Sequence, residues 1–233
     1  MNWSLVSLAH ASTEPSSTDN QNSWHTHSLS IAKLTERLNE EAPFITHFHP
    51  QPTPSLAYQA NSNNLAVIFN RRNLVDCLLS WHHVMVDQAY KRQEELETIG
   101  QAVWAPLQIP FPALRRYIEL SPEAQLSFLI ENVAPWYIQY VANWENSFAR
   151  FDRLKVVDFR ELEHHSAAVL GEINETFGLE IDNKSIEMFS AANPRKVRSS
   201  TIDLPVTERD RETLHIMASR VHGTDFASRL LIG

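Results

Sequence analysis

Hydrophobic residues follow two different spacings along this chain of 233 residues. Leu65–Phe69 is apolar at successive positions, and Leu154–Asp158 is a second short, largely apolar run. Runs of this kind predict strands that are buried on both faces. Elsewhere apolar side chains recur at helical spacing, as they do along Asp76–Arg92. Buried strands that alternate with amphipathic helices predict a helix-rich α/β domain, in which helices cover both faces of a parallel sheet.

Capping residues mark several of the predicted helix ends. Ser121-Pro122 is typical of an N-cap followed by a proline at the first helical position, and the long helical region after it is interrupted near Pro135. A helix over His164–Phe177 is followed by Gly178, which suits a left-handed C-terminal cap. Thr207 opens the last predicted helix with a capping-box pattern.

The N-terminal part of the chain differs from the rest. Residues 12–23 are polar and have no periodicity, so we expect residues 1–27 to form a poorly ordered or divergent segment. Ile31, Leu34 and Leu38 lie at helical spacing and open a single domain that we predict over residues 28–233. Three prolines between positions 50 and 54 are expected to stop any helix there.

Composition and charge narrow the class of function. The chain is 43% hydrophobic and 21% charged, with a formal net charge of −8, which disfavours a nucleic-acid binder but permits a local basic pocket. Its one cysteine, Cys77, excludes an internal disulfide framework and fits a reducing, cytoplasmic compartment. No apolar run approaches the roughly 20 residues of a membrane span, and the N-terminus resembles neither a secretory signal nor an anchor, so we expect no membrane partner.

Glycine is scarce where a phosphate-binding loop would be expected. The first of the five glycines is Gly100, so no glycine-rich phosphate loop precedes or follows the first predicted strand. An anion site at that strand would have to be built from other residues.

Two arginines lie where such a site is expected. Arg71 and Arg72 follow the first strand, and ligands of α/β folds bind beyond the carboxyl ends of the strands. They also precede a helix, whose N-terminal N–H groups and dipole favour an anion. We expect Arg71 to face solvent. Ser80 lies about two turns into the helix and reaches the same spot only if the helix start is irregular.

These residues resemble a family motif. Arg72-Asn73-x-x-Asp76-x-x-x-Ser80, followed by an aromatic residue, is similar to the 3′-phosphate-binding motif of sulfotransferases that use 3′-phosphoadenosine 5′-phosphosulfate (PAPS). The family motif reads Arg-Asn-Pro-x-Asp-x-x-x-Ser, and Leu74 replaces its proline. The resemblance implies that Arg72 and Ser80 hold the 3′-phosphate of the donor.

Further segments resemble this family in the same order along the chain. Residues 136–144 are similar to the helix before the family's second strand. Val156–Leu179 resembles a strand, a Tyr-Glu-Asp-Leu turn and a helix, with Phe159 in place of the tyrosine. Ser185–Phe189 with Asn193-Pro194 resembles the adenine-side helix. The resemblance runs from about Phe44 to the C-terminus and implies the P-loop nucleotide-hydrolase-like sulfotransferase fold.

The resemblance also implies a catalytic base and a basic loop. Thr46-His47 stands 25 residues before Arg72, which suggests His47 as the base, with His49 as a second candidate. Arg195, Lys196 and Arg198 form either a basic loop that closes over the 3′-phosphate or a solvent-exposed turn. The implied reaction transfers a sulfuryl group to a hydroxyl or amine of a small-molecule or carbohydrate acceptor and requires no metal.

The sequence departs from the family at the donor's other end. The Pro-Lys-Ser-Gly-Thr-Thr-Trp loop, which binds the 5′-phosphosulfate, is missing upstream of His47, and Ile45 replaces the lysine of Lys-Thr-His. Either the chain is N-terminally incomplete, or the fold has lost its hold on the phosphosulfate. The alternative function is therefore a catalytically degenerate domain that binds a nucleotide or a protein partner.

A third hypothesis is a histidine-based metal hydrolase. Histidines occur in pairs at positions 25 and 27, 47 and 49, 82 and 83, and 164 and 165. Two histidines that are separated by one residue, as at 25 and 27 or 47 and 49, would share a face of a strand. The four pairs are far apart in sequence and no cysteine cluster accompanies them, so we predict no metal site.

Overall fold

The structure, a computed structural model, describes residues 6–9, 45–48, 51–91, 103–104, 109–110, 116–192 and 204–232. The chain divides into two compact units, residues 1–72 with 143–197 (unit 1) and residues 73–142 with 198–233 (unit 2). Unit 1 contains the larger β-sheet, and unit 2 is mainly helical. The helix predicted around Ile31 lies outside the described residues, as does residue range 1–27 except for one short strand.

The sheet of unit 1 has four strands in the order β2-β1-β3-β6. They are β1 (Val6–Ala9), β2 (Ile45–Phe48), β3 (Ala66–Arg71) and β6 (Leu154–Asp158). β3 and β6 are parallel, whereas β1 is antiparallel to both of its neighbours. The prediction of a parallel sheet is therefore right for β3 and β6 and wrong for the other two strands. Neither Val-Ser-Leu-Ala of β1 nor Ile-Thr-His-Phe of β2 is a continuous apolar run, which is the pattern that predicts a strand of a parallel sheet.

β3 and β6 carry the register that organises this unit. Their pairing runs from Val67 opposite Leu154 to Arg71 opposite Asp158. The chain enters β3 through a turn at Asn64, which has a φ of 50°, a conformation that asparagine tolerates better than most residues. β3 ends two residues beyond the predicted Leu65–Phe69, so Asn70 and Arg71 belong to the strand.

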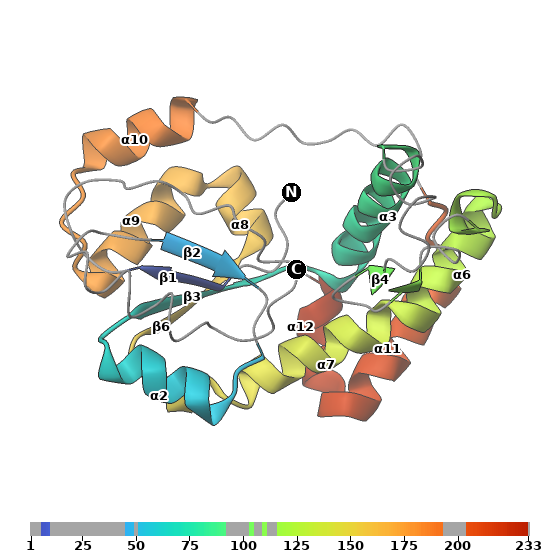
Figure 1. The fold of residues 1–233 in the computed structure, drawn as a ribbon, viewed down its shortest axis with the longest axis horizontal. Coiled ribbons are helices and arrows are strands. Elements are labelled where there is room, and N and C mark those ends of the chain that lie inside the picture. Colours follow the sequence, from blue (N-terminus) through green and yellow to red (C-terminus); the bar gives the residue numbers. More distant parts are fainter. Residues whose placement is uncertain are drawn as a thin grey trace. The chain divides into compact units, whose positions relative to one another are not determined.

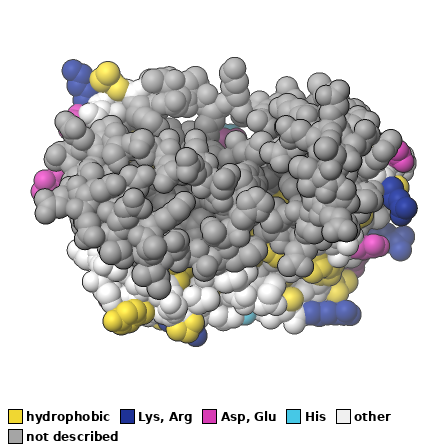
Figure 2. Space-filling view, viewed as in Figure 1, with side chains coloured by type: hydrophobic (Ala, Val, Ile, Leu, Met, Phe, Trp, Pro, Cys, Tyr) yellow, Lys and Arg dark blue, Asp and Glu magenta, His cyan; other side chains and the backbone are white. Residues whose placement is uncertain are grey.

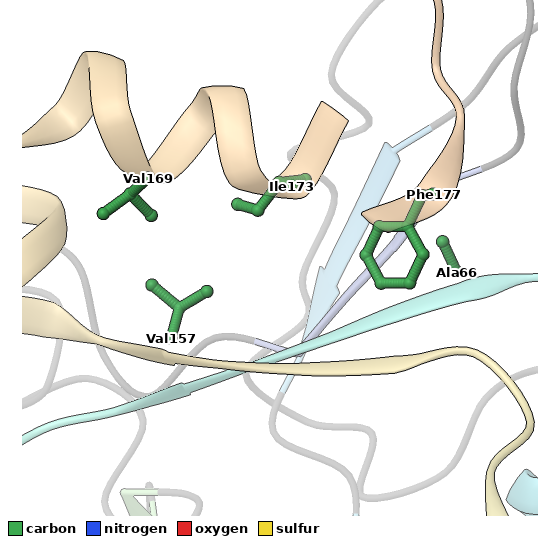
Figure 3. Close-up of a cluster of buried hydrophobic side chains, with 5 residues drawn as sticks. All are labelled: Ala66, Val157, Val169, Ile173 and Phe177. Atoms are coloured by element: carbon green, nitrogen blue, oxygen red, sulfur yellow. The ribbon is translucent and has the colours of Figure 1, made fainter. Parts of the chain in front are cut away.

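One face of the β3–β6 pair packs against a helix. Ala66 and Val157 point from the strands toward Val169, Ile173 and Phe177 (Figure 3). The three helical residues recur at intervals of four, as a helix requires for a single apolar face. Emptying a core position of this kind typically costs about 3–5 kcal/mol for a phenylalanine. This cluster therefore fixes the helix over the two strands.

The opposite face of β3 packs against aromatic side chains. The Phe69 ring stacks on Trp144, with the ring centroids 5.1 Å apart, and lies 5.8 Å from the Phe148 ring. Trp144 in turn stacks on Phe151 at 5.3 Å. Since Phe69 and Ala66 face opposite sides, β3 is buried on both faces, as its apolar sequence predicts.

The helices of unit 1 begin and end at residues with a clear physical role. They are α2 (Pro54–Ser62), the 3-10 helix η2 (Phe148–Arg150), α8 (Phe159–His164), α9 (Ser166–Phe177) and α10 (Asn183–Ala192). Figure 1 shows α2 and α9 on opposite sides of the strands. The sequence did not predict α2, because its prolines were expected to prevent a helix. Pro54 instead starts α2, with the Thr53 side chain accepting a hydrogen bond from the Leu56 N–H at 3.2 Å.

Unit 2 consists mostly of helices. They are α3 (Leu74–Lys91), α6 (Pro122–Asn132), α7 (Ala134–Glu145, whose last residues belong to unit 1), α11 (Glu208–His222) and α12 (Thr224–Ile232). A short ladder pairs β4 (Val103–Trp104) with β5 (Ile109–Pro110). The break between α6 and α7 lies beside Pro135, close to where it was predicted. Trp81 of α3 meets the edge of Trp136 of α7, with the centroids 6.1 Å apart, and both belong to this unit.

These elements confirm a helix-rich α/β protein. Among the described residues, no helix combines the length and the apolar character that crossing a membrane requires. On the face drawn in Figure 2, the described Lys and Arg side chains stand in several separate places, interspersed with acidic and apolar ones.

Candidate functional site

The carboxyl edge of β3 and β6 carries a group of charged side chains. Arg71 ends β3, and its guanidinium lies 3.4 Å from a carboxylate oxygen of Glu145 and 3.9 Å from one of Asp158. Only 23% of the Arg71 side chain is exposed. The expectation that Arg71 faces solvent is therefore wrong. The parallel register places it opposite Asp158, and α7 supplies the second carboxylate.

Arg72 directly follows this pair and is half-buried. Its guanidinium carbon lies 4.1 Å from the centroid of the Phe159 ring. Phe159 is buried at the first position of α8, where the Asp158 side chain accepts a hydrogen bond from the Arg160 N–H at 2.9 Å. Stacking on a buried ring fixes the plane of a guanidinium, whose N–H donors all lie in that plane. Arg72 is thus a partly preorganised cation at the edge where α/β folds bind ligands.

Asn70 lies on the same edge and was missed in the sequence. It is only 3% exposed, and its side-chain oxygen Oδ1 has no hydrogen-bond partner within the part of the chain that the structure describes. In the register it stands opposite Val157, on the face that carries Ala66. The apolar run Leu65–Phe69 predicts a strand that ends at Phe69, whereas β3 continues through the polar residue that directly follows it.

The start of α3, in unit 2, is occupied by its own cap. The Asn73 Oδ1 accepts hydrogen bonds from the N–H groups of Val75 at 2.8 Å and Asp76 at 3.4 Å. Its Nδ2 donates to the backbone carbonyl of Leu231 in α12. Two of the N-terminal amides that the sequence argument assigned to an anion are therefore already satisfied. Any anion near this helix start depends on side chains and on the helix dipole.

Ser80 lies two turns into α3 and is partly exposed. Asp76 and His83, also partly exposed, share its stripe at spacings of four and three residues, whereas the opposite face of α3 is buried. Arg72 ends one segment of unit 1, and Ser80 belongs to unit 2. Their joint role in binding a phosphate stays a prediction.

The remaining predicted site residues are only partly described. His47 lies in the middle of β2, where its backbone pairs with Ser7 of β1. His49, Arg195, Lys196 and Arg198 lie outside the described residues. Within the described ranges, no three His, Cys, Asp or Glu side chains gather as metal ligands would.

Unit 2 contains a buried polar pair that sequence reasoning missed. The His82 Nδ1 lies 2.7 Å from the Tyr117 hydroxyl, and both side chains are almost fully buried. Burial, and secondarily the neighbouring His83, lowers the pKa of His82 to about 4. Burial also raises the pKa of Tyr117 above its ordinary value. His82 is therefore neutral at pH 7. In the sequence, its burial was indicated only by its position next to Trp81 on the apolar face of α3.

No protein-family model matches the chain, and searches of curated proteins and of solved structures found no match.

Proposed function

We propose that this chain binds an adenosine 3′,5′-bisphosphate nucleotide with its 3′-phosphate on Arg72, and that it acts as a PAPS-dependent sulfotransferase. One observation carries the proposal: Arg72 stands at the carboxyl edge of a parallel strand pair, with its guanidinium stacked at 4.1 Å on buried Phe159. An oriented guanidinium suits a phosphate, because its N–H donors match two oxygens at once.

The proposed reaction transfers a sulfuryl group in line between two oxygens, or to an amine nitrogen. Catalysis of such a transfer consists mainly of positioning and of stabilising charge on the leaving bisphosphate. His47 is the proposed base that removes the acceptor's proton, since an imidazole has a suitable pKa near neutral pH. Ser80 and the basic residues Arg195, Lys196 and Arg198 are the further proposed contacts to the 3′-phosphate. The acceptor is a small molecule or a carbohydrate.

The proposal includes the P-loop nucleotide-hydrolase-like sulfotransferase fold and a cytoplasmic location. The parallel pair β3–β6, with α3 directly following β3 along the chain, supports the first. The single cysteine supports the second, because a reducing compartment favours free thiols.

A second candidate is a domain of the same kind that binds the nucleotide, or a protein partner, without catalysis. Two observations favour it: Ile45 replaces the lysine of the family's Lys-Thr-His, and the Asn73 side chain already accepts hydrogen bonds from two N-terminal amides of α3. Loss of a single preorganised donor to the leaving group typically lowers a rate by about 10²–10³-fold. Assays of sulfuryl transfer from PAPS to a panel of phenol, alcohol, amine and carbohydrate acceptors would separate the two candidates.

Calorimetric titration with adenosine 3′,5′-bisphosphate tests the binding step itself. Arg72→Ala should weaken binding about 10- to 100-fold, the loss expected for charge-assisted hydrogen bonds to one phosphate. Arg72→Lys, which keeps the charge but not the planar fork, should give an intermediate affinity. Arg150→Ala is the matched control, because it also removes one arginine of unit 1. Arg150 is exposed and precedes β6, so it lies toward the N-terminal end of that strand, away from Arg72. A wild-type chain that does not bind, or an Arg72→Ala chain that binds equally well, would refute the proposal.

A further inference from the structure

A buried amide at the candidate site lacks a hydrogen-bond partner. Asn70 is 3% exposed, and its Oδ1 accepts no hydrogen bond in the part of the chain that the structure describes. Its neighbours on either side in the strand have clear roles: Phe69 stacks on Trp144, and Arg71 pairs with two carboxylates. Asn70 faces the other way, toward the side of the sheet that α9 covers.

Packing alone does not account for this residue. Ala66 and Ile68, the preceding residues on the same face, are apolar and pack on the α9 cluster. A buried carbonyl oxygen without a partner typically destabilises a fold, whereas an apolar side chain of similar size at the same position would not. Unsatisfied buried polar groups in native proteins are rare, and function is one recognised reason for keeping them.

Asn70 and Arg72 lie close together at the end of β3. Asn70 stands opposite Val157, and Arg72 lies two residues further along, stacked on Phe159, which is two residues beyond Val157. Because Arg72 lies one residue past the end of β3, its Cα is at most about 7 Å from that of Asn70. The groups that neighbour an anion held by Arg72 are therefore within reach of Asn70.

We propose that Asn70 determines specificity by accepting a hydrogen bond from the ribose 2′-hydroxyl of the nucleotide whose 3′-phosphate Arg72 binds. The inference rests on the proposed function and adds a recognition element to it. The 2′-hydroxyl is the donor vicinal to the 3′-phosphate, and it supplies the proton that the amide oxygen lacks. Since Oδ1 is covered in the ligand-free chain, the hydroxyl reaches it only when the side chains around Asn70 move.

A hydrogen bond to Oδ1 should have a measurable effect on nucleotide affinity. Oδ1 has already lost its water in the folded chain, so a hydroxyl that binds it does not have to displace solvent from it. A 2′-deoxy ligand leaves the oxygen unsatisfied in the complex, and losses of this kind correspond to about a tenfold weaker affinity.

The test compares adenosine 3′,5′-bisphosphate with its 2′-deoxy analogue by calorimetry on the full chain. We expect the wild-type chain to bind the deoxy analogue about tenfold more weakly, and Asn70→Leu to bind both nucleotides with the same affinity. Ile68→Val is the matched control on the same face of β3, and it should retain the tenfold preference. Asn70→Leu should also unfold at the same temperature as the wild type or a higher one, because it removes a buried unsatisfied group.

Each outcome decides one of the two claims. Equal affinity of the wild-type chain for the two nucleotides would overturn the role of Asn70 while leaving the proposed function intact. A preference that persists in Asn70→Leu would overturn it as well. If the wild type binds neither nucleotide, the proposed function fails and this inference fails with it. The nucleotide pair is compared on the wild type, so the test stands even if a variant does not fold.

Discussion

The stability of unit 2 should depend on pH through the buried pair of His82 and Tyr117. In the unfolded chain the His82 imidazole has a pKa near 6.5, and in the folded chain its pKa is about 4. Between these two values the unfolded chain binds more protons than the folded chain does. The free energy of unfolding must therefore decrease as the pH falls through this range, while the contribution of His82 is fully retained above pH 6.5.

The expected size of this effect follows from the two pKa values. They differ by about 2.5, and each unit of pKa corresponds to about 1.4 kcal/mol, so folding loses about 3 kcal/mol between pH 7 and pH 4 through His82. A loss of this size is a substantial part of the 5–15 kcal/mol that stabilises a typical domain. The cause is the burial of the imidazole, which opposes its charged form, with a smaller effect of His83.

Urea unfolding, followed by tryptophan fluorescence at a series of pH values, measures this dependence. The double variant His82→Phe with Tyr117→Phe removes both polar partners and should have a shallower pH dependence between pH 7 and pH 4 by about 3 kcal/mol. Tyr117→Phe alone leaves the buried imidazole nitrogen without its partner and should lower the stability at pH 8 by about 1–2 kcal/mol. His165→Gln, which removes an exposed histidine, serves as the control.

An unchanged pH dependence in the double variant would refute the reasoning. It would mean that His82 gains a proton as easily in the folded chain as in the unfolded one, and that the packing around Tyr117 does not exclude water. A Tyr117→Phe chain as stable as the wild type at pH 8 would show that the 2.7 Å contact does not contribute as a hydrogen bond.

Other substitutions test the candidate site and the fold. Phe159→Leu should weaken the binding of adenosine 3′,5′-bisphosphate about 3- to 10-fold, because it releases the Arg72 guanidinium, whereas Phe159→Tyr should bind as the wild type does. Equal affinities of Phe159→Leu and the wild type in calorimetry would count against a role of this stacking. Gly178→Ala should destabilise the chain by about 1 kcal/mol, because Gly178 has a φ of 60°. Gly171 lies inside α9 with open space where a Cβ would be, so Gly171→Ala should stabilise the chain by about 0.5–1 kcal/mol. Thermal unfolding measures both changes. Arg71→Met should lower the free energy of unfolding by about 1–2 kcal/mol in urea, because it removes a cation from beside two partly buried carboxylates, and an unchanged stability would indicate that this ion pairing does not contribute.

Local features of the fold could be predicted from the sequence because short-range chemistry decides them. The Ser121 side chain caps α6 by accepting from the Ala124 N–H at 3.3 Å, and Thr207 forms the predicted capping box with Asp210. Gly178 adopts the predicted left-handed conformation at the end of α9. In each case the groups that interact lie within a few residues of one another, so the pattern itself contains the interaction.

The two buried parallel strands were predicted from the sequence, and the two short antiparallel strands were not. The bounds of β6 were predicted correctly, and β3 was found but extends further than its apolar run. The antiparallel strands β1 and β2 were missed, because each has only four residues and a partner far away in sequence. Their four residues show neither a continuous apolar run nor a regular alternation, so no pattern predicts them without the neighbouring strand.

The sequence by itself determined that this chain is a helix-rich α/β protein, that Arg72 follows a buried strand, and where several helices begin and end. Only the tertiary structure decided which groups meet: Arg71 pairs with Glu145, 74 residues away, and His82 meets Tyr117 across 35 residues. The physical reason is range. A capping side chain bonds to backbone N–H groups a few residues away, whereas a partly buried charge or a buried imidazole bonds to a distant side chain that only the folded packing brings near it.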